Sequence, residues 1–375
     1  MSLFDRRPRL RWAVPVATGA LVLAGVAAGT MSVSADSGLP PMTADELLVA
    51  LTQAQTDTLS GTVVTSADLG LPDLPGGMTA GTDLTSLVSG TNTLRVWVDG
   101  KDRSRVALLA DAQESDVIRN GRDVWVWSSS DRTAEHYVLP EADAKTGAEA
   151  PQEWADFPTT PQEAATRALA ALDPTTEVTT SGVAQVAGRP VYELTLTPKQ
   201  ADTLVARVVI ATDAETRVPL RVQVFSTEIP DPAFEVAFTS VDFAKPDADV
   251  FAFTPPPGAD VTEHSAADGD RPMAYSGSKP DPAKQPTIVG EGWSQVVVVP
   301  VPASGMADLT AAGEDLPAGA GDALALLQAL PRTSGDWGTG SVLSGTLFSA
   351  IMTDDGRIAI GAVTPEALGA ALAAG

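Results

Sequence analysis

The chain has 375 residues but no cysteine, two histidines and little basic charge. Without cysteine there is no disulfide framework, no thiolate metal site and no lipid attached through a cysteine. Lys and Arg number 24 against 48 Asp and Glu, a formal net charge of -24, and no basic cluster follows residue 11. Because nucleic acid binds to concentrated positive charge, these counts argue against a nucleic-acid partner.

Sequence signatures of catalysis are missing as well. No Gly-x-Ser-x-Gly elbow, His-Glu-x-x-His motif or phosphate loop occurs. The histidines, His136 and His264, are interpreted as surface or satisfied side chains. Acidic pairs such as Asp354 and Asp355 lack the alternating ligands and terminal Glu of a calcium loop. We therefore expect a protein that is not an enzyme and binds no cofactor or metal, with a glycosidase pair among the many carboxylates as the open alternative.

The N-terminus predicts export. Four arginines within residues 6–11 precede an uncharged run that ends at Val33-Ser34-Ala35, small residues of the kind that a signal peptidase reads. Residues 1–35 are thus a predicted signal peptide, with the body outside the cytoplasm. Residues 13–31 form an uncharged stretch close to the roughly 20 residues that cross a bilayer core, so an uncleaved membrane anchor stays open.

Two helices and a series of strands follow. A capping box at Thr43 to Glu46 predicts a helix up to about residue 58, and Thr160-Pro161 with Glu163 predicts a second helix that ends before residue 173. β-branched runs between turn residues predict about ten strands. Their ranges are 60–67, 93–98, 103–109, the two arms around residues 120–121, 178–186, 189–197, 203–212, 218–227 and 234–243. This content predicts an α+β domain on one large antiparallel sheet.

The hairpin predicted at Asn120-Gly121 has an apolar residue on both faces of its second arm. Val124 and Val126 point to one side, and Trp125 and Trp127 to the other. Since one face of an antiparallel sheet is commonly solvated, this strand predicts a cover over the second face: a helix, another sheet or a bound apolar molecule. The tryptophans either line an apolar cavity or fill a core between sheet and helix.

A proline-rich stretch divides the chain. Residues 255–290 are predicted to be a linker. Beyond it, residues 291–375 predict a small β-α-β-β-α module. Its expected elements are a strand at 293–301, a helix at 321–330, a hairpin at 347–363 and a final helix from residue 364.

Five segments follow one another in an order that resembles the LolA/LolB/RseB superfamily. They are SGTVV, LRVWVDGKDRSRVALL, DVIRNGRDVWVW, TPQEAATRALAAL and GRPVYELTLTP. The resemblance covers residues 43–254. More narrowly, this region is similar to actinobacterial LolA-like proteins and to the N-terminal domain of RseB/MucB regulators. It implies an unclosed β-barrel of antiparallel strands, with helices plugging an apolar concave face that binds acyl chains. The module at residues 291–375 extends beyond the core of that superfamily.

This resemblance implies a function and a set of candidate residues. We expect a non-enzymatic exported protein that binds or carries lipid or lipoprotein acyl chains in the cell envelope. The alternative is an RseB/MucB-like envelope-stress regulator that binds an anti-sigma factor or another membrane partner. The residues expected to line the apolar cavity are Val96, Trp97, Trp125, Val126, Trp127, Leu196, Val208 and Phe225.

Overall fold

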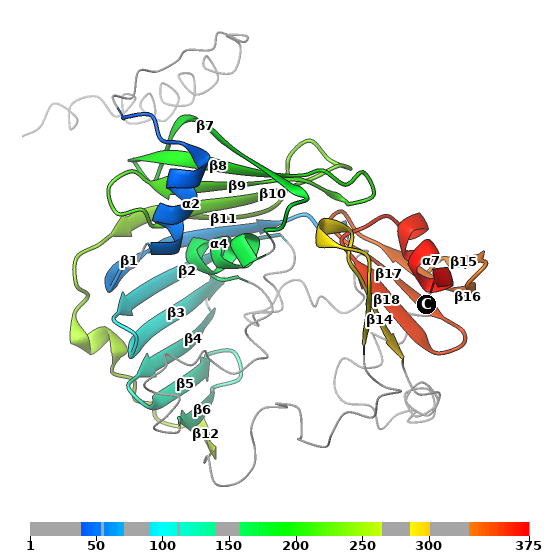
Figure 1. Ribbon diagram of the computed structural model, residues 1–375. Coiled ribbons are helices and arrows are strands. Elements are labelled where there is room, and N and C mark those ends of the chain that lie inside the picture. Colours follow the sequence, from blue (N-terminus) through cyan, green and yellow to red (C-terminus); the bar gives the residue numbers. More distant parts are fainter. Residues whose placement is uncertain are drawn as a thin grey trace, which may run out of the picture. The chain divides into compact units, whose positions relative to one another are not determined.

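The computed structural model describes residues 39–53, 56–70, 90–110, 113–139, 158–170, 172–264, 286–300 and 330–374. The predicted signal segment and residues 321–329 of the predicted helix at 321–330 lie outside these ranges. The helices are α2 (Ala44–Gln53), α4 (Pro161–Ala170) and α7 (Pro365–Ala374). The strands form one large and one small sheet (Figure 1).

The large sheet has twelve strands in the order β12-β6-β5-β4-β3-β2-β1-β11-β10-β9-β8-β7. The first six are β1 (Thr58–Ala67), β2 (Gly90–Asp99), β3 (Arg103–Ala110), β4 (Gln113–Asn120), β5 (Asp123–Ser128) and β6 (Thr133–Val138). The others are β7 (Thr176–Val186), β8 (Arg189–Pro198), β9 (Val205–Asp213), β10 (Pro219–Ser226), β11 (Pro232–Asp242) and β12 (Asp260–His264). In the described part of the chain the two edge strands, β12 and β7, do not pair with each other. The predicted class, a large sheet that is not closed, is confirmed; its neighbouring strands pair antiparallel except for β12 with β6.

Local sequence signals set the turns. β4 and β5 pair antiparallel across the predicted turn, with Asn120 opposite Asp123. Gly121 has φ of 67°, in the left-handed region that a residue without Cβ enters at no steric cost. This turn fixes the register of the hairpin and therefore which side chains share a face.

The capping box of α2 forms in full, whereas that of α4 forms in part, because the carboxylate of Glu163 accepts from the amide of Thr159, one residue before the cap, at 2.8 Å. The amide of Glu46 donates to Thr43 Oγ1 at 3.3 Å, and the amide of Thr43 donates to the carboxylate of Glu46 at 2.9 Å. At α4 the amide of Glu163 donates to Thr160 Oγ1 at 3.2 Å. The predicted end of the first helix near residue 58 is wrong, because Thr58 already pairs with Asp99 as the start of β1.

The two helices lie on one face of the large sheet (Figure 1). Tyr192 donates its hydroxyl to the carbonyl of Pro40 at 2.9 Å, and the segment from Pro40 leads directly into α2. Since Tyr192 and Leu194 alternate to the same side of β8, α2 covers the face that carries Leu194. We call this side the helix face. Its buried apolar residues include Val63, Leu94, Val96, Leu108, Val124, Leu194, Leu196, Val208, Ile210, Val222 and Val236.

The opposite face is crossed by a segment that we call the strap, residues 243–258. The strap leaves β11 and leads to β12 at the far edge of the sheet (Figure 1). Within it, the 3-10 helix η5 (Ala248–Phe251) contacts β3 and β4, and the side chain of Phe251 is buried. Arg132 Nη2 donates to the carbonyl of Pro257 at 2.8 Å and holds the end of the strap beside β6. We call this side the strap face.

β12 lies within residues 255–290, which were predicted to be a linker because of their prolines. It pairs with β6 in parallel, from Asp260 opposite Thr133 to His264 opposite Tyr137. A parallel neighbour needs a long crossover connection, and the strap supplies it. The boundaries predicted at residues 255 and 290 stay predictions.

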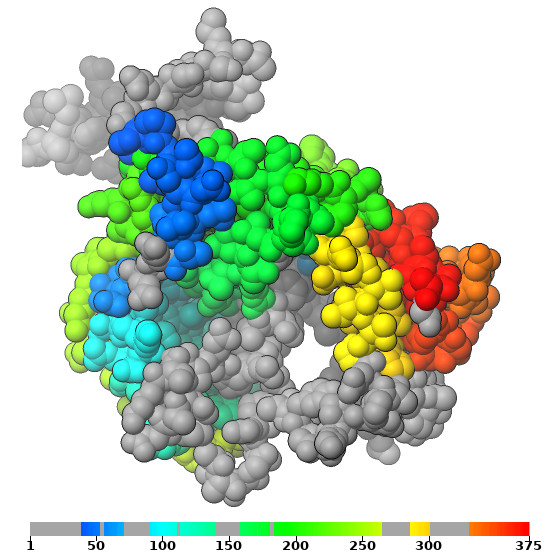
Figure 2. All heavy atoms as spheres, viewed as in Figure 1, coloured from blue at the N-terminus to red at the C-terminus, as the bar shows by residue number. Residues whose placement is uncertain are grey.

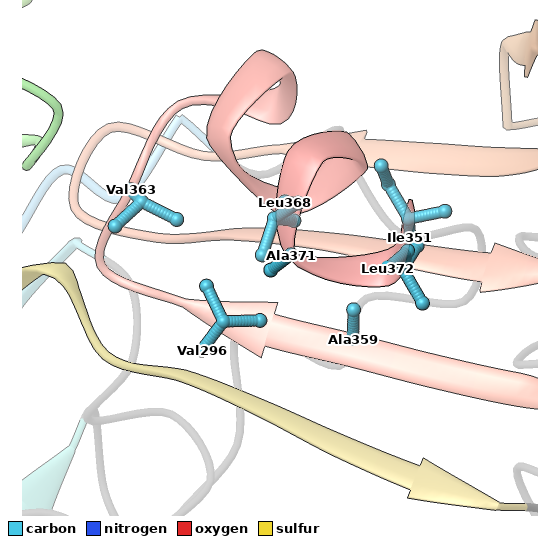
Figure 3. Packing of buried hydrophobic residues seen from close by; sticks show 7 residues of the cluster. All are labelled: Val296, Ile351, Ala359, Val363, Leu368, Ala371 and Leu372. Atoms are coloured by element: carbon cyan, nitrogen blue, oxygen red, sulfur yellow. The ribbon is translucent and has the colours of Figure 1, made fainter. Parts of the chain in front are cut away.

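The small sheet has the order β13-β14-β18-β17-β16-β15, and each neighbouring pair is antiparallel. Its strands are β13 (Thr287–Val289), β14 (Val296–Pro300), β15 (Arg332–Gly335), β16 (Gly338–Ser344), β17 (Ser349–Thr353) and β18 (Arg357–Gly361). α7 packs Leu368, Ala371 and Leu372 against this sheet (Figure 3). β15 and β16 were not predicted, because their polar and glycine-rich sequences lack a clear apolar alternation. β13 was not predicted either, since it has three residues and lies at the end of the stretch interpreted as a linker.

The small sheet contacts the large one through main-chain and side-chain hydrogen bonds. The amide of Leu204 donates to the carbonyl of Ala362 at 2.8 Å. Ser226 Oγ donates to the carbonyl of Thr346 at 2.6 Å. Trp293, in the 3-10 helix η7 (Gly292–Ser294), donates its indole Nε1 to Thr176 Oγ1 at 2.8 Å. Because η7 precedes β14, that strand starts at Val296 and not at the predicted residue 293.

Candidate functional site: the two faces of the large sheet

The eight predicted cavity residues divide between the two faces. Alternation along each strand and the register between strands set the division. On the helix face lie Val96, Val126, Leu196 and Val208. On the strap face lie Trp97, Trp125, Trp127 and Phe225. The structure therefore places the aliphatic members on one face and the aromatic members on the other. On the helix face, Leu196 and Val208 lie on β8 and β9, with β1, β11 and β10 between them and Val96 on β2.

A row of four valines crosses the helix face. Val96, Val106, Val117 and Val126 are direct cross-strand partners on β2, β3, β4 and β5. Val96 is buried, and the other three are half-buried. With strands about 4.8 Å apart, the row spans about 14 Å. In Figure 2 the face that carries α2 is turned toward the viewer.

The valine row ends at a polar cluster on β6 and β12. Val126 pairs with Glu135 on β6. The ring of His264 stacks on Tyr137 with centroids 4.3 Å apart and planes 4° apart. Tyr137 donates its hydroxyl to Glu135, and His264 Nε2 lies 3.5 Å from Glu135 Oε2. The helix face thus offers an aliphatic strip with hydrogen-bonding groups at one end.

Five residues of the helix face were not among the predicted candidates: Val106, Val117, Glu135, Tyr137 and His264. The two valines were within reach of sequence reasoning, because the turns at residues 99–100 and 120–121 fix which residues stand opposite Val96 and Val126. The cluster with His264 was not predictable from the sequence, since a parallel partner strand from a proline-rich stretch leaves no local signal.

The tryptophans of the strap face fill a layer under the strap. Phe253 lies 5.4 Å from Trp125 and 6.0 Å from Trp127, measured between ring centroids. Trp125 also stacks on His136, with centroids 4.1 Å apart and a plane angle of 9°. The rings of Trp125 and Trp127 therefore have protein partners on this face.

His136 joins three strands on the strap face. Its Nδ1 lies 2.6 Å from Glu263 Oε2 on β12, and its Nε2 lies 3.0 Å from Asp123 Oδ1 on β5. The side chain of His136 is mostly buried, whereas both carboxylates are exposed. One ring nitrogen thus ties the edge strand β12 to β6, and the other ties β6 to β5, which is a structural arrangement.

A buried carboxylate lies beneath η5. Asp116 is 2% exposed and accepts from Arg105 Nε at 2.7 Å. Burial raises the pKa of Asp116 to about 6, and the contact with Arg105 opposes this rise. Arg105 also reaches Glu114 at 3.2 Å and the carbonyl of Val250 in the strap at 3.4 Å. The protonation of Asp116 is therefore coupled, through Arg105, to the packing of the strap against the sheet.

A second buried carboxylate shows the opposite behaviour. Asp213 on β9 is fully buried and accepts a charge-assisted bond from Arg189. Burial favours the neutral form, but hydrogen bonds from Arg189 and Thr216 outweigh it and lower the pKa of Asp213. Strong pairing thus keeps Asp213 ionised.

Within the ranges that the structure describes, no three His, Asp or Glu side chains gather as ligands for a metal ion. Among the same residues, no helix has the length and apolar character needed to cross a bilayer.

No family model matches the chain, and no curated protein matches it. Solved structures do. The complex of MucA and MucB from Pseudomonas aeruginosa matches with 16% identity over 88% of this chain and 96% of that chain, with a TM-score of 0.42. A LolA superfamily protein from Nitrosomonas europaea matches with 10% identity over 57% and 99%, with a TM-score of 0.23.

A third match is a putative outer membrane lipoprotein-sorting protein domain from Vibrio parahaemolyticus, with 10% identity over 56% of this chain and 97% of that chain and a TM-score of 0.23. All three TM-scores lie below 0.5, so these matches carry no conclusion about the function of this chain.

Proposed function

We propose that this protein is a non-enzymatic, exported binding protein of the cell envelope that holds lipid or lipoprotein acyl chains on the helix face. The valine row is the observation that supports this most. Val106, Val117 and Val126 stay half-buried, although residues on both sides of the row, such as Leu94 and Val124, are buried. An acyl chain needs such a strip, because each buried methylene contributes about 0.8 kcal/mol without any directed polar partner.

The polar cluster gives the guest a direction. Glu135, Tyr137 and His264 lie at the β6 end of the row. An amphipathic molecule would place its chain along the valines and its polar end beside these groups. The cavity set that we propose is Val96, Val106, Val117, Val126, Leu196 and Val208.

Native mass spectrometry of the purified body, loaded with lipids extracted from membranes, tests the proposal. We expect retained lipid in the unaltered protein and at least about tenfold less in Val117→Gln, because the amide would be desolvated by the chain. Val209→Gln is the matched control. Val209 is a half-buried valine on the strap face of β9, so its substitution should leave lipid retention unchanged. Equal losses in both variants, or no retained lipid at all, would contradict the proposal.

A second function, binding of a protein partner at the membrane, is favoured by the small sheet. Ile288, Val297 and Ile360 are direct cross-strand partners on the face away from α7. Ile288 is 62% exposed and Ile360 is 42% exposed. Neighbouring exposed aliphatic residues of this kind are typical of an interaction surface. This would suit a regulator that responds to envelope state.

Co-purification from membranes with identification of the bound protein tests this second function. Ile360→Lys should remove a specific membrane partner. Val49→Lys is the control, because Val49 is an exposed valine on α2, 53% exposed. A partner lost equally from both variants, or from neither, would count against the surface.

Export is part of the proposal. The segment that would direct it, residues 1–35, lies outside the described residues. N-terminal sequencing of the protein from its native envelope fraction separates the two forms. A start after residue 35 indicates cleavage, and an intact N-terminus in the membrane fraction indicates an anchor. Recovery in the cytoplasm would overturn export.

A further inference from the structure

A small pocket opens on the strap face, on the side of the sheet opposite the valine row. It has a volume of about 230 Å³ and is lined by residues of β1, β2 and β11. Two cross-strand rows form its floor: Ser240, Thr62 and Arg95, and beside them Asp242, Ser60 and Trp97. The lining is more polar than apolar, so the pocket suits a hydrophilic ligand.

Arg95 gives the pocket an available positive charge. Three other arginines of this face are paired with carboxylates: Arg103 with Asp99, Arg105 with Asp116 and Arg221 with Glu193. In the part of the chain that the structure describes, Arg95 has no carboxylate partner. Its guanidinium lies 5.1 Å from the ring centroid of Trp97. In a chain of net charge -24, such a cation is a preferred place for an anion.

Hydroxyl groups surround this cation. Ser60, Thr62 and Ser240 line the pocket, and within the described chain their hydroxyls make no hydrogen bond to protein. Together with the five N–H donors of a guanidinium, they form a donor set that matches a phosphate group.

Asp242 adds the opposite charge at the other side of the pocket. One of its carboxylate oxygens, Oδ1, accepts from the amide of Ala244 at 2.8 Å. Asp242 and Arg95 stand two strands apart, so their backbones are separated by about 10 Å across the pocket. A ligand that carried an anion alone would be repelled by Asp242, whereas one with an anion and an ammonium group would satisfy both residues.

We propose that this pocket binds a phosphate-bearing zwitterion of the phosphoethanolamine class. Arg95, Ser60, Thr62 and Ser240 hold the phosphate, and Asp242 holds the ammonium group. The ligand displaces the guanidinium of Arg95 from the ring of Trp97. This site is independent of acyl-chain binding, because it lies on the other face of the sheet.

Calorimetry with O-phosphoethanolamine, inorganic phosphate and ethanolamine as separate probes tests the site. We expect phosphoethanolamine to bind at least about tenfold more tightly than either half alone. Arg95→Gln should weaken its binding at least about tenfold. Arg207→Gln is the control, because Arg207 is exposed on the same face, stacked on Phe225, and should leave the affinity unchanged.

Two further variants separate the roles of the lining. Asp242→Asn should remove the preference for phosphoethanolamine over inorganic phosphate. Trp97→Phe should keep binding in calorimetry but abolish the ligand-induced change in tryptophan fluorescence. Equal affinities for phosphate and phosphoethanolamine in the unaltered protein, or no saturable binding up to about 10 mM, would overturn the proposal.

Vesicles distinguish the source of the headgroup. Sedimentation with phosphatidylethanolamine vesicles that is lost in Arg95→Gln identifies the headgroup of a membrane lipid as the ligand. Binding of soluble phosphoethanolamine without vesicle binding identifies a free small molecule. Arg95→Gln should still retain lipid on the helix face, and Val117→Gln should still bind phosphoethanolamine, so the two sites can fail separately.

Discussion

The two faces of the large sheet are covered in different ways. The helix face is mainly aliphatic, and α2 and α4 lie against it. The strap face carries tryptophans and ion pairs, and part of it lies under residues 243–258. β5 takes part in both, with Val126 on one face and Trp127 on the other. A strand with two apolar faces therefore does not by itself imply a bound ligand, because one cover can be another segment of the same chain.

The two covers also differ in which side chains of the sheet they leave partly exposed. On the strap face, Phe253 occupies the space beside Trp125 and Trp127. On the helix face, Val106 and Val117 remain half-buried. The larger side chains thus pack under the strap, and the smaller ones border the space that we propose for an acyl chain.

Removing the anchor of the strap should have the largest effect on stability. Phe251 is 1% exposed, so Phe251→Ala should lower the free energy of unfolding by about 3–5 kcal/mol. Urea denaturation followed by tryptophan fluorescence measures the change. The control is Phe253→Leu, which keeps an apolar side chain over Trp125 and should cost less than about 1.5 kcal/mol. A small loss for Phe251→Ala would mean that the strap does not stabilise this face.

The buried proton of Asp116 should make the stability of the strap face depend on pH. The pKa of Asp116 is raised from 3.8 to about 6, so between these values the folded protein holds a proton that the unfolded chain has released. This contribution is therefore full below pH 4 and is lost as the pH rises through 6. Asp116→Asn cannot titrate. Its unfolding free energy relative to the unaltered protein should rise by about 1.4 kcal/mol between about pH 5 and pH 7.5.

Urea titrations of both proteins at several pH values check this difference. Comparing the two proteins removes the contribution of carboxylates that they share. Parallel curves across this pH range would show that Asp116 does not hold a proton in the folded state.

The turn that sets the faces of β5 should give the smallest effect. Gly121 has φ of 67°, and a Cβ added there would meet no atom within 4 Å. Gly121→Ala should thus cost about 1 kcal/mol through backbone conformation alone. Gly121→Asn should cost less, because Asn tolerates this conformation better. Thermal unfolding compares the two. If both substitutions lowered the stability by the same amount, the cause would be steric and not the backbone conformation at residue 121.

Local features were predictable from the sequence. The capping boxes at Thr43 and Thr160 and the turn at Gly121 depend on residues within a few positions of each other. The alternation of Val126 and Trp127 also predicted two covered faces. It did not say which face meets the helices, because that depends on a contact between Tyr192 and Pro40 across 152 positions of the chain.

Non-local features were missed for the same reason. The tryptophans were predicted to line the cavity because their strands carry apolar residues on both faces, whereas their partner Phe253 lies on the strap, beyond β11. β12 was hidden among prolines, and β15, with the sequence RTSG, has no apolar pattern to reveal it. In each case a tertiary contact, and not local propensity, determined the outcome.

Photo-crosslinking with a diazirine fatty acid tests most directly that the helix face holds the guest. Peptide mapping after irradiation locates the labelled residues. Our account predicts labels on β3, β4 and β5 at Val106, Val117 and Val126. Labels concentrated on the strap, or on Trp125 and Trp127, would contradict it.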